Sequence, residues 1–249
     1  MTIASYSMFD TYKEKINSLT PPTDEASLLT DQFLLEKDPE KHLEIYYAPF
    51  EYINENAKVV IVGITPGLHQ MKKTFSTVWK LKDEAIGDEK ILQEVKKTSS
   101  FEGPMRKNLI AMLDELGLHK YLGISSSTEL FGQANDLIHT TSVLPYPVFY
   151  KGKNYSGSTP SIVKTELFRK YLTKCFPEAI NKSSNPLIIP LGVNVTKALN
   201  FLAENEYIPA NPILNGFPHP SGSNGHRHRQ FAVNKEEMKR MLEEYFNNN

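Results

Sequence analysis

This sequence of 249 residues has one cysteine, no long apolar run and almost no net charge. A single cysteine, Cys175, excludes an internal disulfide and offers no second thiolate at a zinc-site spacing. No apolar run approaches the ~20 residues that a membrane-spanning helix needs. The N-terminus MTIASYSMFDTYKEK lacks the basic start and the apolar stretch of a signal peptide. A formal net charge of −1 at pH 7 gives no global signature of a nucleic-acid binder. We therefore expect a cytoplasmic protein that does not associate with a membrane.

Acidic residues are missing from three long segments of the chain. Residues 63–82, 137–165 and 207–235 contain no Asp or Glu, and they hold ten of the 28 Lys and Arg residues. The rest of the chain therefore carries 18 basic residues and all 29 acidic residues. If the three segments meet in space, they give an otherwise acidic protein one positive face. The ten cations are Lys72, Lys73, Lys80, Lys82, Lys151, Lys153, Lys164, Arg227, Arg229 and Lys235.

Strand-like and helix-like patterns alternate along the chain. Apolar runs that end in turn residues predict strands, as in NAKVVIVGITPG (56–67). Apolar residues at helical spacing predict helices, as in GPMRKNLIAMLDELGL (103–118), where Pro104 and Gly117 suit the two helix termini. We expect further strands within 135–149, 185–192 and 211–222, and further helices within 23–37, 163–175, 193–205 and 234–246, the last with Asn234 as its N-cap.

This alternation predicts an α/β protein with three layers, α/β/α, around a central four-stranded parallel sheet that is covered on both faces. We expect a single domain, with residues 1–55 as an N-terminal helical extension and residues 56–246 as the core. In such sheets ligands bind outside the carboxyl ends of the strands. The three acid-free segments begin at or around those ends, so we expect them to converge on one crevice.

Two loops carry a resemblance to a known superfamily. GITPG (63–67) follows the first core strand, HPSGSNGHR (219–227) follows the last, and LGVNVTKAL (191–199) lies between them. In this order the motifs resemble the uracil-DNA glycosylase superfamily over residues 56–246, and the first loop is most similar to its mismatch-specific and single-strand-selective branches. The resemblance implies that fold. It also implies a cofactor-free enzyme of base excision repair that hydrolyses the bond between a sugar and a flipped or unpaired deaminated base in DNA.

The resemblance assigns roles to residues of both loops. His219 and the backbone amide of Ile64 become the donors that stabilise negative charge on the departing base. Gly63, Pro66 and Gly67 shape the first turn around the base. Gly67 is expected to leave room where the classical branch has a tyrosine, so that bases larger than uracil fit.

Other positions depart from the superfamily pattern. Thr65 stands where the superfamily has a water-activating Asp or a water-holding Asn, and a hydroxyl orients water without acting as a general base at neutral pH. The strand HTTSVL offers Ser142 or Thr140 in place of an Asn that reads the uracil edge. Phe75 is expected to stack on the base, with Trp79 as the alternative.

The second loop is expected to hold the nucleic acid. Ser223 stands near the wedge leucine of the classical branch, and its small side chain favours a single strand or a free nucleobase over a duplex. The residues expected to contact DNA are Ser221, Ser223, Asn224, His226 and Arg227, with Arg227 and the Lys-bearing loops on phosphate.

A second hypothesis, from another class, is a non-catalytic protein that keeps the glycosylase fold and binds a nucleic acid, a nucleobase or a nucleotide. The histidines at 219, 226 and 228 have no carboxylate near in sequence, so we expect no metal site. The single cysteine also excludes the four-cysteine iron–sulfur cluster of some branches. We expect a monomer.

Overall fold

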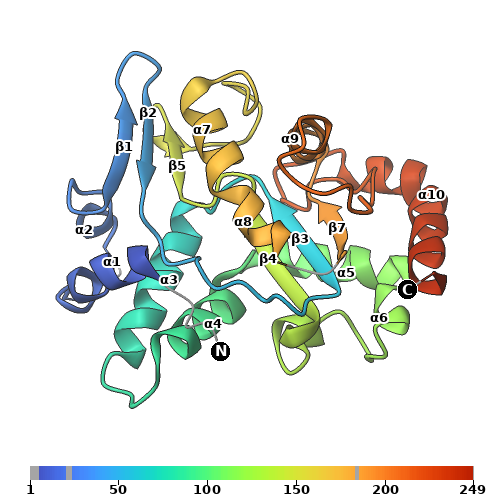
Figure 1. Ribbon diagram of the computed structural model, residues 1–249, viewed down its shortest axis with the longest axis horizontal. Helices are drawn as coiled ribbons and strands as arrows, with labels where there is room; N and C mark the ends of the chain where they lie inside the picture. The colour runs from blue at the N-terminus through green and yellow to red at the C-terminus, as the bar shows by residue number, and fades with distance from the viewer. Residues whose placement is uncertain (1–5, 21–23, 183–184, 249) are drawn as a thin grey trace.

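A computed structural model describes residues 6–20, 24–182 and 185–248. In this part of the chain, a parallel sheet of three strands in the order β4-β3-β7 forms the centre of the molecule (Figure 1). All five residues of the central strand are buried, which is typical of a parallel strand covered on both faces. The strands are β3 (Val59–Gly63), β4 (Ile138–Ser142) and β7 (Leu187–Pro190).

The expected fourth strand is reduced to a single bridge. Ile213 pairs with Ile188 in parallel, and hydrogen bonds join Ile188 N to Pro212 O and Leu214 N to Ile188 O, both at 2.8 Å. Prolines at 209, 212 and 218 lack the N–H groups that a longer ladder needs. The prediction of a parallel sheet is therefore confirmed, but the described chain forms three strands and one bridge instead of four strands.

Helices cover both faces of the sheet, so the predicted three-layer arrangement is confirmed. Val60 and Val62 of β3 point into one core cluster, and Val59 and Ile61 point into the other. The first cluster is covered by α7 (Glu166–Lys174), α8 (Phe176–Asn181) and α9 (Val193–Glu204), and the second by α5 (Pro104–Leu116), α6 (Leu118–Tyr121) and α10 (Arg227–Asn247).

The start of the last helix differs from the prediction. The helix α10 begins at Arg227, so Asn234 lies inside it and is not its N-cap. The Asn234 side chain instead donates to Gly216 O at 3.3 Å. Phe231, from the added first turns, packs edge-on against Phe217 with ring centroids 6.2 Å apart. This tertiary contact buries an aromatic ring and explains why the helix extends further than the local N-cap signal indicated.

The N-terminal segment is not the predicted helical extension. The predicted helix over 23–37 is wrong: its described part holds only the short helix α2 and then a strand, and residues 1–5 and 21–23 lie outside the described residues. A second, antiparallel sheet runs in the order β1-β2-β5-β6. Leu43 and Ile45 bury one face of that hairpin against the core, so tertiary pairing overrides the helical pattern. These elements are α1 (Ser7–Asn17), α2 (Glu25–Leu28), β1 (Leu34–Asp38), β2 (Leu43–Tyr46), β5 (Val148–Tyr150) and β6 (Lys153–Asn154).

Two further helices connect the first core strand to the rest of the molecule. The helices α3 (Leu68–Leu81) and α4 (Asp88–Ser99) pack on each other and on the N-terminal elements. Short 3-10 turns, η1 (Glu129–Phe131) and η2 (Asn135–Leu137), precede β4. Among the described residues, no helix combines the length and apolar character that crossing a bilayer requires.

Candidate functional site

The two motif loops lie at the same edge of the parallel sheet. Val143 N donates to Gly63 O at 3.0 Å, which joins the carboxyl ends of β3 and β4. Leu191 N donates to Val62 O at 2.8 Å, and Gly192 N donates to Phe217 O at 3.0 Å, which brings the 219–227 loop to the end of β7. The loops that the sequence singled out therefore meet at the carboxyl ends of neighbouring strands, as expected.

His219 lies against the turn that follows β7. A Cβ added to Gly192, whose φ is +95°, would lie only 3.1 Å from the Cβ of His219. Nδ1 of His219 accepts a hydrogen bond from the Ser221 N–H at 3.3 Å, so the hydrogen-bond network assigns the ring proton to Nε2. Burial lowers the pKa of His219, which favours the neutral ring at pH 7. Nε2–H has no hydrogen-bond partner among the described residues, so it is a free donor.

Thr65 is tied to the loop that leaves β4. Its hydroxyl donates to Tyr146 O at 2.7 Å and accepts from Val148 N at 3.2 Å. A hydroxyl has one proton and two lone pairs, so one lone pair remains for a water molecule. The structure therefore gives Thr65 a clear role in holding the GITPG turn against residues 146–148, which the sequence did not indicate.

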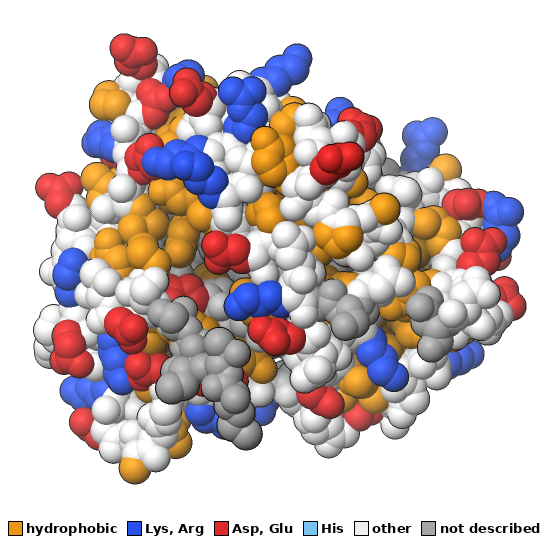
Figure 2. Space-filling view, viewed as in Figure 1, with side chains coloured by type: hydrophobic (Ala, Val, Ile, Leu, Met, Phe, Trp, Pro, Cys, Tyr) orange, Lys and Arg blue, Asp and Glu red, His pale blue; other side chains and the backbone are white. Residues whose placement is uncertain are grey.

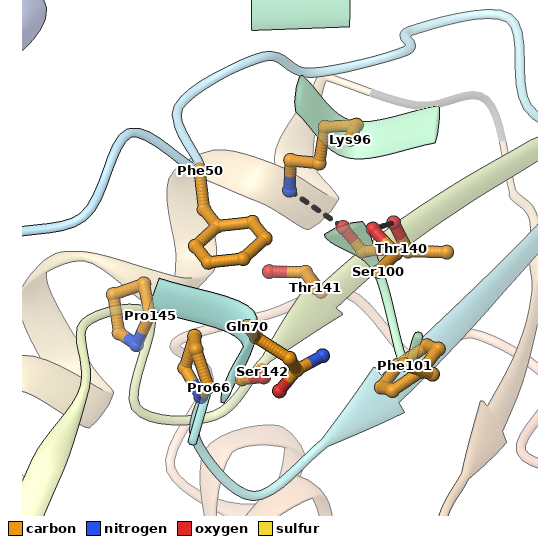
Figure 3. Close-up of a pocket in the computed structure, with 10 residues that line it drawn as sticks. All are labelled: Phe50, Pro66, Gln70, Lys96, Ser100, Phe101, Thr140, Thr141, Ser142 and Pro145. Carbon is orange, nitrogen blue, oxygen red and sulfur yellow. Dashed lines mark hydrogen bonds between the residues drawn. The ribbon is translucent and has the colours of Figure 1, made fainter. Parts of the chain in front are cut away.

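A hollow opens beside this turn, at the carboxyl ends of β3 and β4 (Figure 3). The space between its side chains, including open solvent at the mouth, is about 300 Å³. Two aromatic rings border it, Phe50 and Phe101, and the hydroxyls of Thr141 and Ser142 form no hydrogen bond with another described residue. The remaining lining residues are Pro66, Gln70, Lys96, Ser100, Thr140 and Pro145.

Gly63 gives the hollow its width. A Cβ at this position would lie 2.9 Å from Cε1 of Phe101 and 3.3 Å from Oγ of Ser142. Phe101 itself has a positive φ of 54°, a conformation that a bulky residue adopts only when its surroundings require it. The close approach of this ring to β3 thus explains why the strand ends in glycine.

Replacing Gly63 by alanine is expected to lower the free energy of unfolding by about 1–3 kcal/mol, because the Phe101 ring must move to admit the methyl group. Urea denaturation measures this change. Gly222→Ala is the matched control, since an added Cβ there has no neighbour within 4 Å, and its effect is expected to stay within about 0.5 kcal/mol. Equal effects of the two substitutions would contradict this account of the hollow.

Phe75, the predicted stacking residue, does not line the hollow. Its side chain is 0% exposed and packs edge-on against Phe33, with ring centroids 4.8 Å apart. The stacking role predicted for Phe75 is therefore wrong. Phe75 is spaced four residues from Trp79 on α3, and the inner face of this helix is used for the N-terminal core. Trp79 does not line the hollow either, and Lys82 lies over its ring.

The first loop contributes to the hollow unevenly. Pro66 lines it, but Ile64, Thr65 and Gly67 do not, and a Cβ at Gly67 would lie 3.6 Å from the Asn154 side chain. The Gly67 position faces the Asn154 side chain on β6, and the expectation that Gly67 leaves room for the base stays a prediction. The N–H of Ile64 has no partner among the described residues, whereas its carbonyl accepts from Leu144 N at 3.0 Å. The amide that the sequence proposed as a donor is available.

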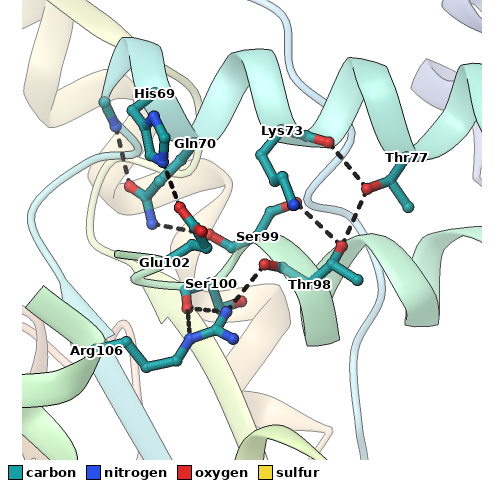
Figure 4. Close-up of polar contacts among 10 residues, drawn as sticks. His69, Gln70, Lys73, Thr77, Thr98, Ser99, Ser100, Glu102 and Arg106 are labelled. Carbon is teal, nitrogen blue, oxygen red and sulfur yellow. Dashed lines mark hydrogen bonds and ion pairs between the residues drawn. The ribbon is translucent and has the colours of Figure 1, made fainter. Parts of the chain in front are cut away.

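A network of polar contacts fixes the opposite wall of the hollow (Figure 4). The Gln70 side chain accepts from Gly67 N at 3.0 Å and donates to Ser99 O at 3.3 Å. Arg106 donates to Ser100 O from Nε at 2.9 Å and from one terminal nitrogen at 2.6 Å. Ser100 Oγ and Thr140 Oγ1 lie 2.6 Å apart. These contacts hold the 98–101 turn, and with it the Phe101 ring, against β4.

A buried lysine reaches the hollow from α4. Lys96 is 8% exposed, and its Nζ donates to Thr140 O at 2.6 Å, on the open edge of β4. Burial lowers the pKa of Lys96 to about 7, with partial compensation by Glu51. Burial also raises the pKa of Glu51 to about 7 and lowers that of His139, which lies next to Thr140 on β4. Titratable groups with perturbed pKa values of this kind gather at functional sites.

The stability of the protein is expected to depend on Lys96 in a pH-dependent way. Because the pKa of Lys96 is lower in the folded protein, the unfolded chain binds the proton more tightly. The free energy of unfolding therefore increases as the pH rises above about 7. Lys96→Met removes the effect. Wild type is therefore expected to gain up to roughly 1 kcal/mol of unfolding free energy per pH unit, relative to Lys96→Met, between about pH 7 and 9. Denaturation at both pH values measures it, with the exposed Lys90→Met on the same helix as control. A difference that is constant with pH would contradict the prediction.

The residues expected to contact DNA form one loop at the start of α10. Ser221 and Ser223 share a hydrogen bond at 2.8 Å, Asn224 donates to His219 O at 3.1 Å, and His226 is the N-cap of α10. Nε of Arg227 is buried and has no hydrogen-bond partner within the part of the chain that the structure describes. The loop is thus ordered by its own contacts around His219, and its role in contacting DNA remains a prediction.

The expected positive face is not a single patch. The helices α3 and α10, which carry six of these cations, lie on opposite sides of the parallel sheet (Figure 1). Lys72 lies 3.8 Å from Glu25, and Lys235 lies 2.7 Å from Glu115, so two of the ten are paired with acids from other segments. Acidic and basic side chains are interspersed on the face shown in Figure 2. The three segments approach one another where they pass the carboxyl ends of the strands, near Gly63, Val143 and Phe217.

Sequence reasoning missed Phe50, Phe101 and Lys96. A signal for Lys96 exists, because it lies four residues after Leu92 and next to Val95 on the apolar face of an amphipathic helix. The two phenylalanines lie in irregular segments without a periodic pattern, so only the tertiary structure places them at the hollow.

Comparison with known proteins assigns a family. No model of a known protein family matches the chain. The uncharacterized protein YoxB of Bacillus subtilis (strain 168) is 40% identical over 245 residues, which cover 98% of this chain and 95% of YoxB. The chain belongs to the YoxB family. Since the match extends over nearly the whole of both proteins, the N-terminal elements are as much part of the YoxB family pattern as the α/β core.

A solved structure was also matched. The crystal structure of wild-type SMUG2 from Pedobacter heparinus superposes with a TM-score of 0.45 over 95% of this chain and 99% of that chain, at 13% identity. A TM-score below 0.5 does not establish a shared fold. The fold and the site therefore rest on the strands and contacts of this chain.

Proposed function

We propose that this protein hydrolyses the bond between a deaminated base and its sugar in DNA, and that it holds the base in the hollow at the ends of β3 and β4. The state of His219 carries the proposal. Its ring is neutral, and Nε2–H is a fixed donor without an acceptor. A departing base gains negative charge, and a preorganised donor stabilises that charge most in the transition state.

The order of the strands provides donors on both sides of a bound base. The N–H of Ile64, which has no partner among the described residues, follows directly after β3. Ser142, at the end of β4 on one side, lines the hollow, and His219 lies beyond β7 on the other side, outside this lining. The flanking strands lie two strand spacings apart, about 10 Å. A base over the end of β3 would have one edge toward Ser142 and the other toward His219. The resemblance of both loops to uracil-DNA glycosylases supports the same placement.

The contacts of Thr65 favour a second candidate function, a binding protein without catalysis. With its proton donated to Tyr146 O, the hydroxyl has only an acceptor for water, and it has no basic group. If no other group activates water, the protein binds a nucleobase or a single strand and leaves the sugar bond intact.

Incubation with labelled oligonucleotides followed by alkali tests the proposal. The strands carry uracil, hypoxanthine or xanthine at one position, single-stranded or in a duplex, with unmodified strands as controls. We expect abasic sites in single strands, formed by wild type and formed about 10²–10³-fold more slowly by His219→Ala purified in the same way, which excludes a contaminating glycosylase. The absence of cleavage on every strand would refute hydrolysis. Salt-dependent binding without cleavage would support the second candidate.

A further inference from the structure

The ammonium group of Lys96 is only partly satisfied inside the protein. Its single hydrogen bond among the described residues is the one to Thr140 O, and no carboxylate of these residues forms an ion pair with it. An ammonium has three protons, so two have no acceptor. A buried charged donor without acceptors is costly unless a ligand supplies them.

The side chain is directed toward the hollow. Its nitrogen points between Phe50 and Thr141 (Figure 3), and it lies 5.7 Å from the centroid of the Phe50 ring. Lys96 also borders a second hollow, with Tyr52 and Asn135 among the lining residues. The first hollow adds two aromatic rings and the free hydroxyls of Thr141 and Ser142, the features that a planar, hydrogen-bonding ligand needs.

We propose that Lys96 determines which base the hollow accepts, by donating hydrogen bonds to a carbonyl oxygen on the edge of the base nearest β4. In its charged form Lys96 has no lone pair that could accept a hydrogen bond from an amino group. A base with an amino group at that position therefore leaves the two remaining ammonium protons of Lys96 unpaired. A site whose buried polar group is left unpaired rejects the wrong ligand strongly. This inference rests on the proposed function for the nature of the ligand, and it adds a residue outside both motif loops.

Binding of free uracil and free cytosine tests the proposal, because uracil has a carbonyl at C4 where cytosine has an amino group, and the neighbouring N3 carries a proton only in uracil; the Lys96 variant isolates the contribution of the C4 group. Ligand-observed NMR titration of the full chain at pH 6, below the lowered pKa of Lys96, where the ammonium form predominates, gives both dissociation constants. We expect wild type to bind uracil at least about tenfold more tightly than cytosine, the size of one charge-assisted hydrogen bond. Lys96→Met keeps the length of the side chain and is expected to abolish the preference, whereas Lys90→Met, on the exposed face of α4, keeps it.

Further variants locate the ligand and check the fold. Ser142→Ala, in the first hollow, is expected to weaken uracil binding, and Asn135→Ala, in the second, is expected to leave it unchanged. Lys96→Met is expected to remain folded, because replacing a buried charge by an apolar side chain is often neutral or stabilising. The inference is overturned if wild type binds neither base or binds both equally. It is also overturned if the Lys96→Met variant still prefers uracil.

The outcome is separable from that of the proposed function. A preference that depends on Lys96, together with no base release from any strand, supports the inference and refutes hydrolysis. Base release at equal rates by wild type and Lys96→Met, with no preference between the free bases, supports hydrolysis and refutes the inference.

Discussion

Replacement of His219 by alanine is expected to slow base release about 10²–10³-fold, the usual effect of removing one donor from a developing negative charge. The Ser221 N–H donates a hydrogen bond to Nδ1 of His219, and burial lowers the pKa of the ring. Nε2–H is therefore left as a donor beyond the end of β7. Because the donor acts most strongly as the bond breaks, the loss should appear in the single-turnover rate and much less in the affinity for the strand.

The control for His219 is another histidine of the same region. His228 is exposed on the first turn of α10, and His228→Ala removes an imidazole without touching the hollow. We expect its rate to equal that of wild type at fixed salt. A His219→Ala rate within about twofold of wild type, or a loss confined to strand affinity, would remove His219 from the chemistry.

Replacement of Thr65 by aspartate is expected to raise the rate of base release, by about 10²-fold or more, because a carboxylate supplies the general base that a hydroxyl lacks. The same change should destabilise the protein. Aspartate can still accept from Val148 N, but it has no proton for Tyr146 O, and an unpaired group at a partly buried site costs about 1–3 kcal/mol.

Thr65→Val separates these two effects. Valine has the shape of threonine and removes both hydrogen bonds, so it is expected to match or exceed the loss of stability without any gain in rate. The stability to denaturation and the single-turnover rate of base release are measured for wild type, Thr65→Asp and Thr65→Val. If Thr65→Asp is no faster than Thr65→Val, the water is not placed at this position, and the assignment of Thr65 to the site fails.

The core of the fold could be predicted from the sequence because its signals are local. The buried run VVIVG, the helix between Pro104 and Gly117, and the alternation of strands and helices all specify their own elements. The N-terminal hairpin could not be predicted in this way. Its strand β1 pairs with β2, and β2 pairs with β5, more than 100 residues away in the chain. Such long-range pairing leaves no local pattern that would override the helical spacing of 23–37.

The positions of the two motif loops in the fold could be predicted from the sequence, whereas the residues that border the hollow by packing could not. The order of the loops placed Thr65 and His219 at one edge of the sheet. Phe75 lies close to the first motif in the sequence, which made it a candidate for stacking on the base. In the structure its position on α3 directs the side chain into the core. Phe101, by contrast, borders the hollow and approaches Gly63, and only the three-dimensional contact shows this.

The central claim is that the hollow between Phe50, Phe101 and Ser142 is the base site. A crystal structure of the protein with a short single strand that carries a hydrolysis-resistant, 2′-fluorinated deoxyuridine tests it most directly. We predict that the uracil lies in this hollow, with one carbonyl oxygen within hydrogen-bond distance of Lys96 Nζ and the other facing Nε2 of His219. A base bound elsewhere on the protein, with the hollow occupied only by water, would contradict the account.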